Sequence, residues 1–418
     1  MSTNSKIIRD PIHGDIKIRG LFLDLMESPE LQRLYNIKQL GFADLVFPGA
    51  HHTRLEHSLG TYFMAVKAAE ILNLNKKEKN ILACAALLHD IGHGPFSHTL
   101  ESILRETLKE DHVDLTEKLI FGKHVIFNSE EKKFIKSKSV YDILNKHNID
   151  KKEITDIIRG KNKEKQYLSQ LLNSCIDVDQ LDYLIRDAYY TGVAYGIIDT
   201  ERFLQTLVKN NEKLAVSKKG VGVVENILMA RSLMYSSVYF HKTVRIAELM
   251  LSKAIELIND KEPFEFFKMT DAELINELKN RDPYSREIAT RLKYRSLFKQ
   301  AYNVSITNKD KKYIEIIKKL ENPDFKRKKE QELEEFFKIP AGHIIIDVPL
   351  KELHLAEPRI DLTNIYIIDN NEIKILDDYT PVAKAIKKRI IPEWELMVIT
   401  DEKYREVISK KANKIIFN

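Results

Sequence analysis

The sequence has little cysteine: Cys84 and Cys175 are the only two in 418 residues. Two cysteines cannot build a disulfide framework or a cysteine-based zinc motif. Long hydrophobic runs are also lacking, because no apolar segment is long enough to span a bilayer and the first residues have no apolar signal region. The composition therefore argues against a disulfide-stapled secreted domain and a membrane protein, and it predicts a protein of the reducing cytoplasm.

A large excess of one charge sign is absent as well. The 67 basic residues are nearly balanced by 62 acidic ones, which leaves a net charge of +5. This mild excess suits anionic ligands, but it is not by itself the signature of a nucleic-acid-binding protein. Hydrophobic residues make up 43% of the chain, so a protein of this length is expected to form two or three globular domains.

One stretch of the chain combines an apolar helix with side chains that bind metals. The apolar run Leu82–Leu88 stops at His89 and Asp90, and His93 and His98 follow among glycines and a proline that break the helix. A single histidine at the end of an apolar helix is usually a capping or core residue. An adjacent His-Asp pair with further histidines instead favours a divalent metal, because imidazole and carboxylate are common ligands of Zn, Fe, Mn and Ni.

Two ligands rarely hold a metal, so a metal site at the His-Asp pair needs further ligands from elsewhere in the chain. His57 lies at the start of a helix predicted over about 53–74, and Asp179 lies on an apolar helix predicted over 171–190. Three converging helices would place two imidazoles and two carboxylates around one ion. Such a set leaves positions open for water and for a phosphate oxygen, as a catalytic site requires.

The pattern of elements predicts a mainly α fold. Residues 1–20 indicate a turn and a short β element, helical patterns continue to about residue 302, and strand-like segments alternate with short helices after Pro340. The expected strands are 344–348, 365–368 and 396–399. We expect a multi-helix body at 1–300 with its metal core at about 50–190, a charged helical connector at 301–340, and a small α/β (α+β) domain at 341–418.

Several motifs follow one another in an order typical of one protein family. They are Asp10-Pro11-Ile12-His13-Gly14, Phe47-Pro48-Gly49-Ala50, Arg54-x-Glu56-His57-Ser58-Leu59-Gly60, His89-Asp90-x-Gly92-His93-Gly94-Pro95-Phe96-Ser97-His98 and Asp179-x-x-Asp182-Tyr183-x-x-Arg186-Asp187. With them the chain resembles the deoxynucleoside triphosphate triphosphohydrolase (dNTPase, dGTPase) branch of the HD-domain phosphohydrolases, from about residue 6 to residue 300. The resemblance implies one divalent metal per active site (Mg, Mn, Fe, Zn or Ni) and an additional Mg with the nucleotide. The implied ligands are His57, His89, Asp90 and Asp179.

The resemblance also implies a reaction. A water activated by the metal would attack the α-phosphorus of a deoxynucleoside triphosphate and release a deoxynucleoside and an intact triphosphate. A histidine would protonate the leaving 5′ oxygen, and the candidates for this acid are His98 and His112. The residues implied around the α-phosphate are His93, His98, His112 and, as a supporting carboxylate where the family often has aspartate, Glu101.

Further positions match residues that bind the substrate in this branch. Cationic side chains suit a triphosphate because they grip phosphate oxygens, and the matched ones are Arg54, Arg231 and Lys242. The positions matched to the deoxyribose or the base are Gln39, Leu40, Tyr183, Asp187 and Tyr239. One departure is Gln180, which replaces a lysine that contacts phosphate in a human member of the branch.

That human member is a tetramer activated by nucleotides bound between its subunits. Its effector positions match Lys6, Ile7, Gln32, Arg202, Arg295 and Lys299. Glu27 and Tyr35 depart from the residues that read a guanine effector there. The resemblance thus implies a homo-oligomer, a dimer or a tetramer, with dGTP or GTP as effector. The alternative is that these residues make ordinary surface or subunit contacts.

Two other functions stay open at the level of sequence. The first is an HD phosphohydrolase for another phosphoester, such as a nucleoside monophosphate, a guanosine polyphosphate or an oligonucleotide, which Gln180 favours. The second is a module that binds nucleotides or single-stranded nucleic acid with little turnover, against which the complete ligand set argues. The sequence does not specify the native metal, the preferred base, the effector or the role of the C-terminal domain.

Overall fold

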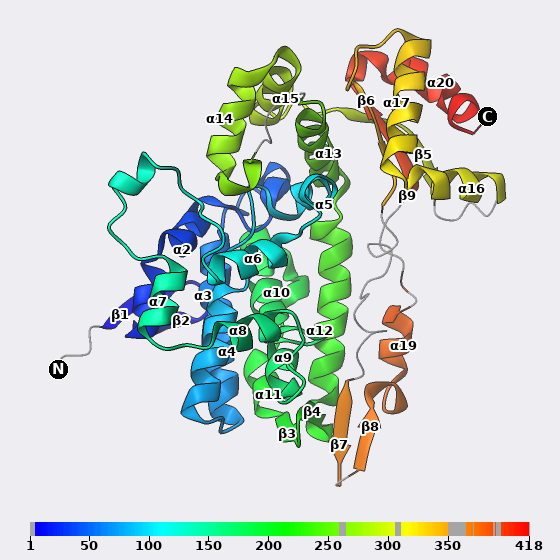
Figure 1. Cartoon of the computed structure of the whole chain (residues 1–418). Coiled ribbons are helices and arrows are strands. Elements are labelled where there is room, and N and C mark those ends of the chain that lie inside the picture. Colours follow the sequence, from blue (N-terminus) through cyan, green and yellow to red (C-terminus); the bar gives the residue numbers. More distant parts are fainter. Residues whose placement is uncertain are drawn as a thin grey trace. The chain divides into compact units, whose positions relative to one another are not determined.

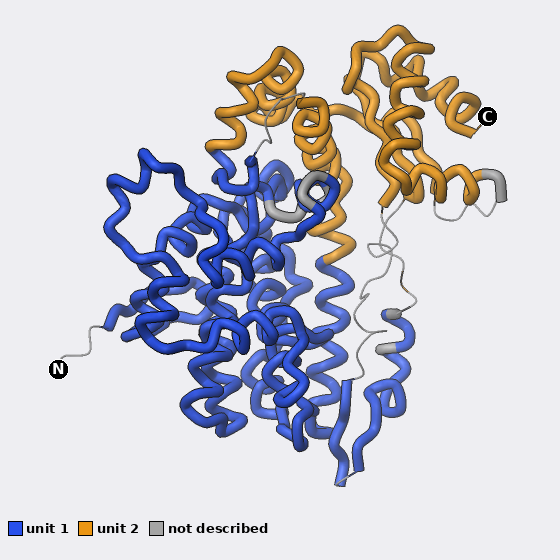
Figure 2. The backbone as a smooth tube through the Cα atoms, in the orientation of Figure 1, with its two compact units in different colours: residues 1–234, 265–272, 357–388 blue, residues 235–264, 273–356, 389–418 orange. Residues whose placement is uncertain are grey.

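The structure is a computed structural model that describes residues 5–258, 265–305, 311–349, 365–370, 372–387, 389 and 394–417. It is mainly helical with small sheets, which confirms the predicted fold class. The chain forms two compact units whose segments alternate along the sequence (Figure 2). Unit 1 contains residues 1–234, 265–272 and 357–388, and unit 2 contains residues 235–264, 273–356 and 389–418.

Unit 1 is built around three long helices that lie side by side, α3 (Arg54–Ile71), α4 (Lys76–Leu88) and α10 (Val178–Thr191) (Figure 1). The apolar half of α4 is completely buried, as its sequence predicts. The other helices of unit 1 are α1 (Leu21–Met26), α2 (Pro29–Arg33), α5 (Glu101–Leu108), α6 (His112–Ile120), α7 (Val140–Lys146), α8 (Lys151–Ile158), α9 (Gln166–Leu172), α11 (Thr200–Gln205), α12 (Val221–Met234) and α19 (Pro381–Lys387).

Local capping residues set where the central helices begin. Thr53 and Glu56 form a capping box at the start of α3, in which each side chain accepts a hydrogen bond from the other residue's backbone N–H. Asp177 caps α10 by accepting from the backbone N–H of Gln180 at 2.9 Å. Helix α10 ends at Gly192, whose φ of 72° suits glycine. The caps therefore place His57 and Asp179 within the first turns of their helices.

The β elements of unit 1 form two sheets. Strands β1 (Ser5–Asp10) and β2 (Gly14–Arg19) make an antiparallel hairpin in the register Ser5↔Arg19, with Ile16 and Ile18 buried. The second sheet has the order β3-β4-β7-β8, in which β4 and β7 run parallel. Its strands are β3 (Leu207–Asn210), β4 (Lys213–Ser217), β7 (Tyr366–Asp369) and β8 (Glu372–Ile375).

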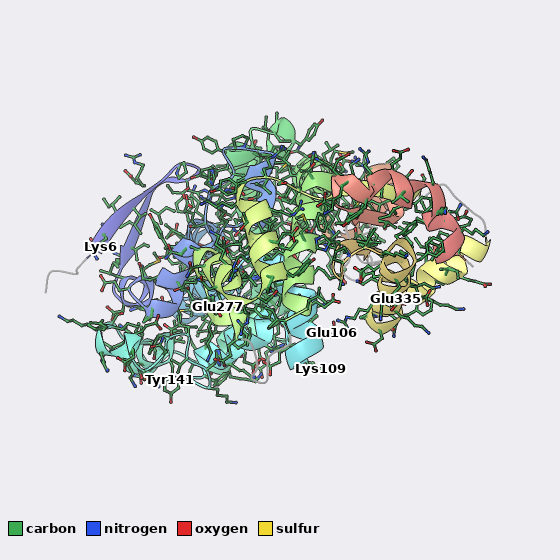
Figure 3. The ribbon with its side chains drawn as sticks, turned by 90° about the horizontal axis from the view of Figure 1, so that it is seen from above. Lys6, Glu106, Lys109, Tyr141, Glu277 and Glu335 are labelled. Atoms are coloured by element: carbon green, nitrogen blue, oxygen red, sulfur yellow. The ribbon has the colours of Figure 1, made fainter. Side chains whose placement is uncertain are left out.

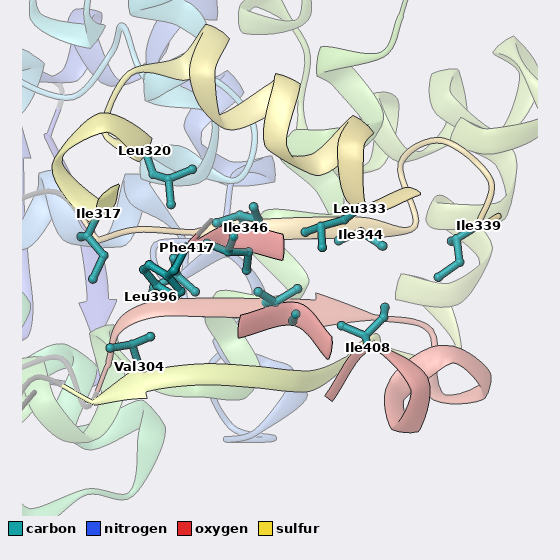
Figure 4. Packing of buried hydrophobic residues seen from close by; sticks show 13 residues of the cluster. Val304, Ile317, Leu320, Leu333, Ile339, Ile344, Ile346, Leu396, Ile408 and Phe417 are labelled. Atoms are coloured by element: carbon teal, nitrogen blue, oxygen red, sulfur yellow. The ribbon is translucent and has the colours of Figure 1, made fainter. Parts of the chain in front are cut away.

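Unit 2 joins an antiparallel sheet of order β5-β9-β6 to helices. Its strands are β5 (Lys299–Ser305), β9 (Trp394–Thr400) and β6 (Ile344–Asp347), and its helices are α13 (Lys242–Glu256), most of α14 (Asp271–Arg281), α15 (Pro283–Lys293), α16 (Lys311–Leu320), α17 (Pro323–Phe337) and α20 (Arg405–Ile416). Apolar side chains from the sheet and from α16, α17 and α20 form one core (Figure 4). The expectation of helix up to residue 302 is wrong at β5, because pairing with the buried strand β9 overrides local propensity there.

Two glutamates of α17 bond to the strand β6, which lies at the edge of its sheet. The Glu330 carboxylate accepts from the backbone N–H of Ile346 at 2.8 Å, and that of Glu334 accepts from the N–H of Ile344 at 3.3 Å. Burial raises the pKa of Glu334 to about 7, although the hydrogen bond from the backbone N–H of Ile344 favours the charged form of this carboxyl. The side chains thus supply acceptors to a strand edge that the sheet leaves unpaired.

Unit 2 is expected to lose stability as the pH rises through the pKa of Glu334. The folded state binds this proton more tightly than the unfolded chain, so the stabilisation is complete below about pH 4.5 and is lost toward pH 7. We predict that Glu334→Gln weakens the dependence of the unfolding temperature on pH between about pH 4.5 and pH 7. Glu335→Gln, at the next and exposed position (Figure 3), is the control that should keep the wild-type slope. Parallel profiles for all three proteins would contradict the prediction.

Candidate metal centre

The expected ligands come together at the ends of the central helices of unit 1. The Nε2 atom of the buried His57 lies 3.0 Å from Asp179 Oδ1, and His89 Nε2 lies 3.8 Å from the same oxygen. His89 Nε2 is also 3.3 Å from Asp90 Oδ1. Ligand atoms of His57, His89 and Asp90 lie within 4.8 Å of one another. Two imidazoles and two carboxylates, from α3, from the two residues directly after α4 and from α10, therefore surround one point.

The orientation of these side chains fits a divalent ion. His89 donates its Nδ1–H to the carbonyl of Ala86 at 2.8 Å, which leaves Nε2 directed toward the carboxylates. His57 has the same arrangement, with Nδ1 2.8 Å from Asp182 Oδ2. A partner on the second nitrogen is the usual arrangement around a histidine that ligates a metal. The donor set is nitrogen and oxygen without sulfur, which suits Mn, Fe, Ni or Zn and does not choose among them.

The electrostatics of the cluster are those of closely paired opposite charges. Burial opposes charge on His57, but the hydrogen bonds with Asp179 and Asp182 outweigh it and raise the pKa of His57 to about 10. Burial likewise opposes charge on Asp90, whereas His89 and Arg54 hold its pKa well below the usual value. Arg54 makes a direct ion pair with Asp90. A cation at this point would face the carboxylates that pair with His57 and Arg54 in this structure.

A second group of polar residues lies beside the ligands. The rings of His93 and His112 are stacked at 3.9 Å between centroids, and His112 donates its Nδ1–H to Glu101 Oε1 at 2.9 Å. Burial and the nearby Arg54 lower the pKa of His93 well below its usual value, so this imidazole is neutral. A small pocket is lined by these three side chains and by Leu100, Leu104 and Phe267. His98 lies in the short 3₁₀ segment Ser97–Leu100, and its side chain is outside the described residues.

Close packing holds α6 against the turn after the His-Asp pair. The Thr116 hydroxyl accepts from the backbone N–H of Gly92 at 3.0 Å and donates to the carbonyl of His89 at 3.1 Å. A Cβ on Gly92 would lie 2.2 Å from the His112 carbonyl oxygen. Glycine is thus needed at this position because the two backbones approach too closely for a side chain.

Two residues that the sequence did not single out brace the same turn. Arg33 donates to the carbonyls of Ile91 and His93 at 3.0 and 2.7 Å. Asp271, a buried carboxylate, accepts from the backbone N–H of Phe96 at 2.7 Å and from that of Lys38 at 2.9 Å. Only the fold brings these positions to the turn, and no local motif marks them. Both act on backbone groups, so they shape the loop rather than offer ligands.

One face of α10 connects the metal ligand with the residues expected at the sugar. Asp179, Tyr183 and Asp187 are four residues apart and therefore lie on one side of the helix. The Tyr183 ring meets the His57 ring edge-on at 6.2 Å between centroids. Asp187 Oδ1 lies 2.7 Å from Nε2 of His52, a buried residue that the sequence analysis missed.

The loop before α3 reaches Asp187 through His52. The backbone N–H of Gln39 donates to the His52 carbonyl at 3.0 Å, and the buried side-chain oxygen of Gln39 has no hydrogen-bond partner among the described residues. A substrate hydroxyl would satisfy such an acceptor. Leu40 follows directly and is half-buried.

The remaining substrate positions are more dispersed. Arg231 is buried on α12 in unit 1, whereas Tyr239 and Lys242 belong to unit 2, so their role beside the ligands stays a prediction. The Gln180 side chain is buried, and its amide donates to the carbonyl of Ser174 at 2.8 Å. The Gln180 side chain is therefore bonded to the loop before α10, whereas the lysine that it replaces in the human member contacts phosphate.

The positions matched to an effector lie on several elements. Lys6 and Ile7 are exposed on β1, where Lys6 pairs with Glu27 at 2.6 Å (Figure 3). Gln32 lies on α2 and donates to the carbonyl of Met26 at 2.6 Å. The other matched positions are Arg202 on α11, and Arg295 and Lys299 in unit 2. Their function stays a prediction.

None of the described helices combines the length and the apolarity that a membrane crossing needs.

Comparison with known families identifies the region that holds the cluster. The model of the HD domain matches residues 54–187, and the model of the HD associated region matches residues 198–417. The first match contains the four expected ligands. The second covers more than half of the chain and includes elements of both units.

Individual relatives agree with these matches. A protein of uncharacterised function from Methanocaldococcus jannaschii is 34% identical over 98% of this chain and 84% of its own length. The human deoxynucleoside triphosphate triphosphohydrolase SAMHD1 is 30% identical over 70% of this chain, and the match spans 54% of the human protein. The crystal structure of a phosphohydrolase from Bacteroides thetaiotaomicron has a TM-score of 0.72 at 26% identity and covers 96% of this chain and all of that one.

Proposed function

The chain belongs to the HD-domain phosphohydrolases, and from this premise we propose that it hydrolyses deoxynucleoside triphosphates at the α-phosphate to a deoxynucleoside and triphosphate. One observation carries the proposal: the cluster of His57, His89, Asp90 and Asp179, in which His57 and Asp90 are buried, lies beside the stacked pair of His93 and His112. The human relative with this named activity supports the choice of substrate. Its match spans about half of that protein, so the substrate is part of the proposal.

The residues of this chain can be assigned roles in that reaction. His57, His89, Asp90 and Asp179 would hold a divalent ion, which would supply Lewis-acid activation of water and of a phosphate oxygen. Arg54, buried at Asp90, provides a fixed positive charge for phosphate oxygens. Asp187 and Gln39 offer acceptors to a sugar hydroxyl, and Tyr183 packs between that end and the ligands.

A proton must reach the 5′ oxygen as the bond to phosphorus breaks. We assign this step to His112 or His98, as general acid. For His112 the assignment rests on Glu101, which accepts its Nδ1–H, and on the position of the ring in the wall of the pocket. Glu101 therefore fixes the orientation of the ring.

His112→Ala is expected to lower kcat by about 10²- to 10⁴-fold, the usual contribution of a general acid. The four ligands are unchanged, so the variant should still bind one divalent ion per chain. Single-turnover kinetics and metal analysis of the purified variant measure both quantities. The same pair of measurements on His98→Ala decides between the two candidates. Unchanged kcat in both variants would contradict the assignment of a histidine acid.

The experiment for the proposed function is product analysis. Purified protein is incubated with each dNTP, singly and mixed, with Mg²⁺ or Mn²⁺, and the products are separated by chromatography. Deoxynucleoside with intact triphosphate is the expected result. No cleavage of any dNTP by protein that holds metal would overturn the proposal. A panel of nucleoside monophosphates, guanosine polyphosphates and oligonucleotides then tests the other phosphoesters, which Gln180 favours because it replaces the lysine that contacts phosphate in the human member of the branch.

We extend the proposal to regulation and assembly. Activation by dGTP or GTP at a homo-oligomer interface would involve Lys6, Ile7 and Gln32. Lys6 pairs with Glu27, and Gln32 donates to the carbonyl of Met26, the residue that precedes Glu27. Turnover of another dNTP only when dGTP or GTP is added supports this regulation. Equal turnover without it, at the same oligomeric state by light scattering, would overturn it.

A further inference from the structure

A buried carboxylate behind the ligands is shared between a ligand and the N-terminal hairpin. Asp182 lies on α10 and its side chain is fully buried. Its Oδ2 lies 2.8 Å from His57 Nδ1 and accepts from Arg186 Nε at 2.9 Å. Its Oδ1 lies 2.6 Å from His13 Nε2 and accepts from Arg186 Nη2 at 2.9 Å. Both oxygens of this carboxylate are therefore held by two nitrogens each.

The turn between β1 and β2 is fixed to the same group from the other side. Asp10 accepts the backbone N–H of Ile12 at 2.9 Å and that of His13 at 2.8 Å, which sets the conformation of the turn. The other oxygen of Asp10 accepts from Arg186 Nη1 at 2.8 Å. The His13 ring packs against Phe63 of α3 at 4.8 Å between centroids. The turn thus presents His13 to Asp182 in one orientation.

Helix α3 leaves room for this network. A Cβ on Gly60 would lie 1.8 Å from Asp182 Oδ1 and 2.4 Å from Arg186 Nη2. Gly60 follows His57 by three residues, so the gap and the imidazole lie on one face of the helix. The carboxylate can reach His57 Nδ1 only because this face has no side chain at position 60.

We propose that Asp182 is a positioning residue for His57, and that the β1–β2 turn, through His13 and Asp10, forms part of the support of the metal centre. A carboxylate at Nδ1 fixes the ring and the tautomer that offers Nε2 to a metal, and it increases the basicity of that nitrogen. Arg186 is shared between the carboxylates of Asp182 and Asp10. His13 adds a second donor at Oδ1, which stops the carboxylate from turning away from His57. The inference rests on the metal centre of the proposed function.

The test measures metal affinity rather than turnover. Protein stripped with a chelator is titrated calorimetrically with Mn²⁺ as wild type, Asp182→Asn, His13→Ala and His13→Gln. Asp15→Asn on β2 is the matched control, because its exposed carboxylate pairs with Arg9 and does not touch Asp182. We expect about 10- to 100-fold weaker binding for Asp182→Asn and about 10-fold for His13→Ala. His13→Gln should recover most of the affinity, because its amide can donate to Oδ1, and Asp15→Asn should match the wild type.

Affinities of Asp182→Asn and His13→Ala equal to that of Asp15→Asn would overturn the inference. If Asp182→Asn does not fold by circular dichroism, the two His13 variants decide: a loss in alanine with recovery in glutamine supports the inference, and equal affinities overturn it. A wild type that binds Mn²⁺ but cleaves no dNTP would overturn the proposed function and leave this inference intact. A wild type that binds no Mn²⁺ would overturn both.

Discussion

Asp179→Ala will reduce the turnover of dNTPs at least about a thousandfold and will lower the metal content of the protein. A catalytic metal supplies several kcal/mol of transition-state stabilisation, and each 1.4 kcal/mol or so corresponds to a factor of ten in rate. Asp179 Oδ1 lies 3.0 and 3.8 Å from the Nε2 atoms of both expected histidine ligands. Its removal takes away one of two anionic ligands and leaves the two imidazoles without their common partner.

Metal analysis of the purified protein and initial rates with each dNTP measure these losses. The matched control is Asp324→Ala, because Asp324 also lies in the first turn of a helix, α17, but its side chain is 91% exposed. The control should keep wild-type rates and metal content. Full activity of Asp179→Ala with unchanged metal content would refute the assignment of this ligand.

Gly60→Ala is expected to disrupt unit 1 although it adds only a methyl group. The new Cβ would lie 1.8 Å from Asp182 Oδ1, in a region where Asp182 and Arg186 are fully buried. Overpacking costs about 1–3 kcal/mol, and separating a buried ion pair about 3–5 kcal/mol. The carboxylate must also move away from His57. We therefore expect a lower unfolding temperature together with weaker metal binding.

Gly222→Ala is the matched control for that substitution. Gly222 is also a helical glycine, on α12, but a Cβ there has no atom within 4 Å. Alanine should raise stability by about 0.5–1 kcal/mol at this position, because it restricts the unfolded chain. Thermal unfolding followed by circular dichroism compares the two variants. Similar unfolding temperatures for both would contradict the packing argument.

The central helices of unit 1 could be predicted from the sequence because their signals are local, and the four candidate ligands lie together in the structure. The capping box at Thr53 marks the start of α3 and so places His57 in its first turns. The end of the apolar run marks the end of α4 and so places His89 directly after it. The short strands β3 and β4, the expected helix at β5 and the contact of His52 with Asp187 were missed or wrong. Strands β3 and β4 form a local hairpin that the periodicity did not reveal. The pairing of β5 with β9 and the contact of His52 with Asp187 depend on partners far along the chain, which local propensity and periodicity do not contain.

The supporting residues were the hardest part of the site to predict. Asp182 and His13 appeared in recognised motifs, yet their separation of 169 positions gave no sign that they touch. Arg33 and Asp271 act on backbone groups of the turn that carries His93, and no sequence pattern identifies such a contact. The candidate ligands can thus be predicted from motifs, whereas the contacts of the residues behind them are seen only in the fold.

The most direct test of the account is hydrolysis of a dNTP in water enriched in heavy oxygen, with mass spectrometry of the products. Attack of water on the α-phosphorus places the heavy oxygen in the released triphosphate, and the deoxynucleoside keeps its original 5′ oxygen. We predict labelled triphosphate with unlabelled deoxynucleoside, and no label transfer in Asp179→Ala. Label in the deoxynucleoside, or release of orthophosphate or pyrophosphate in place of triphosphate, would contradict it.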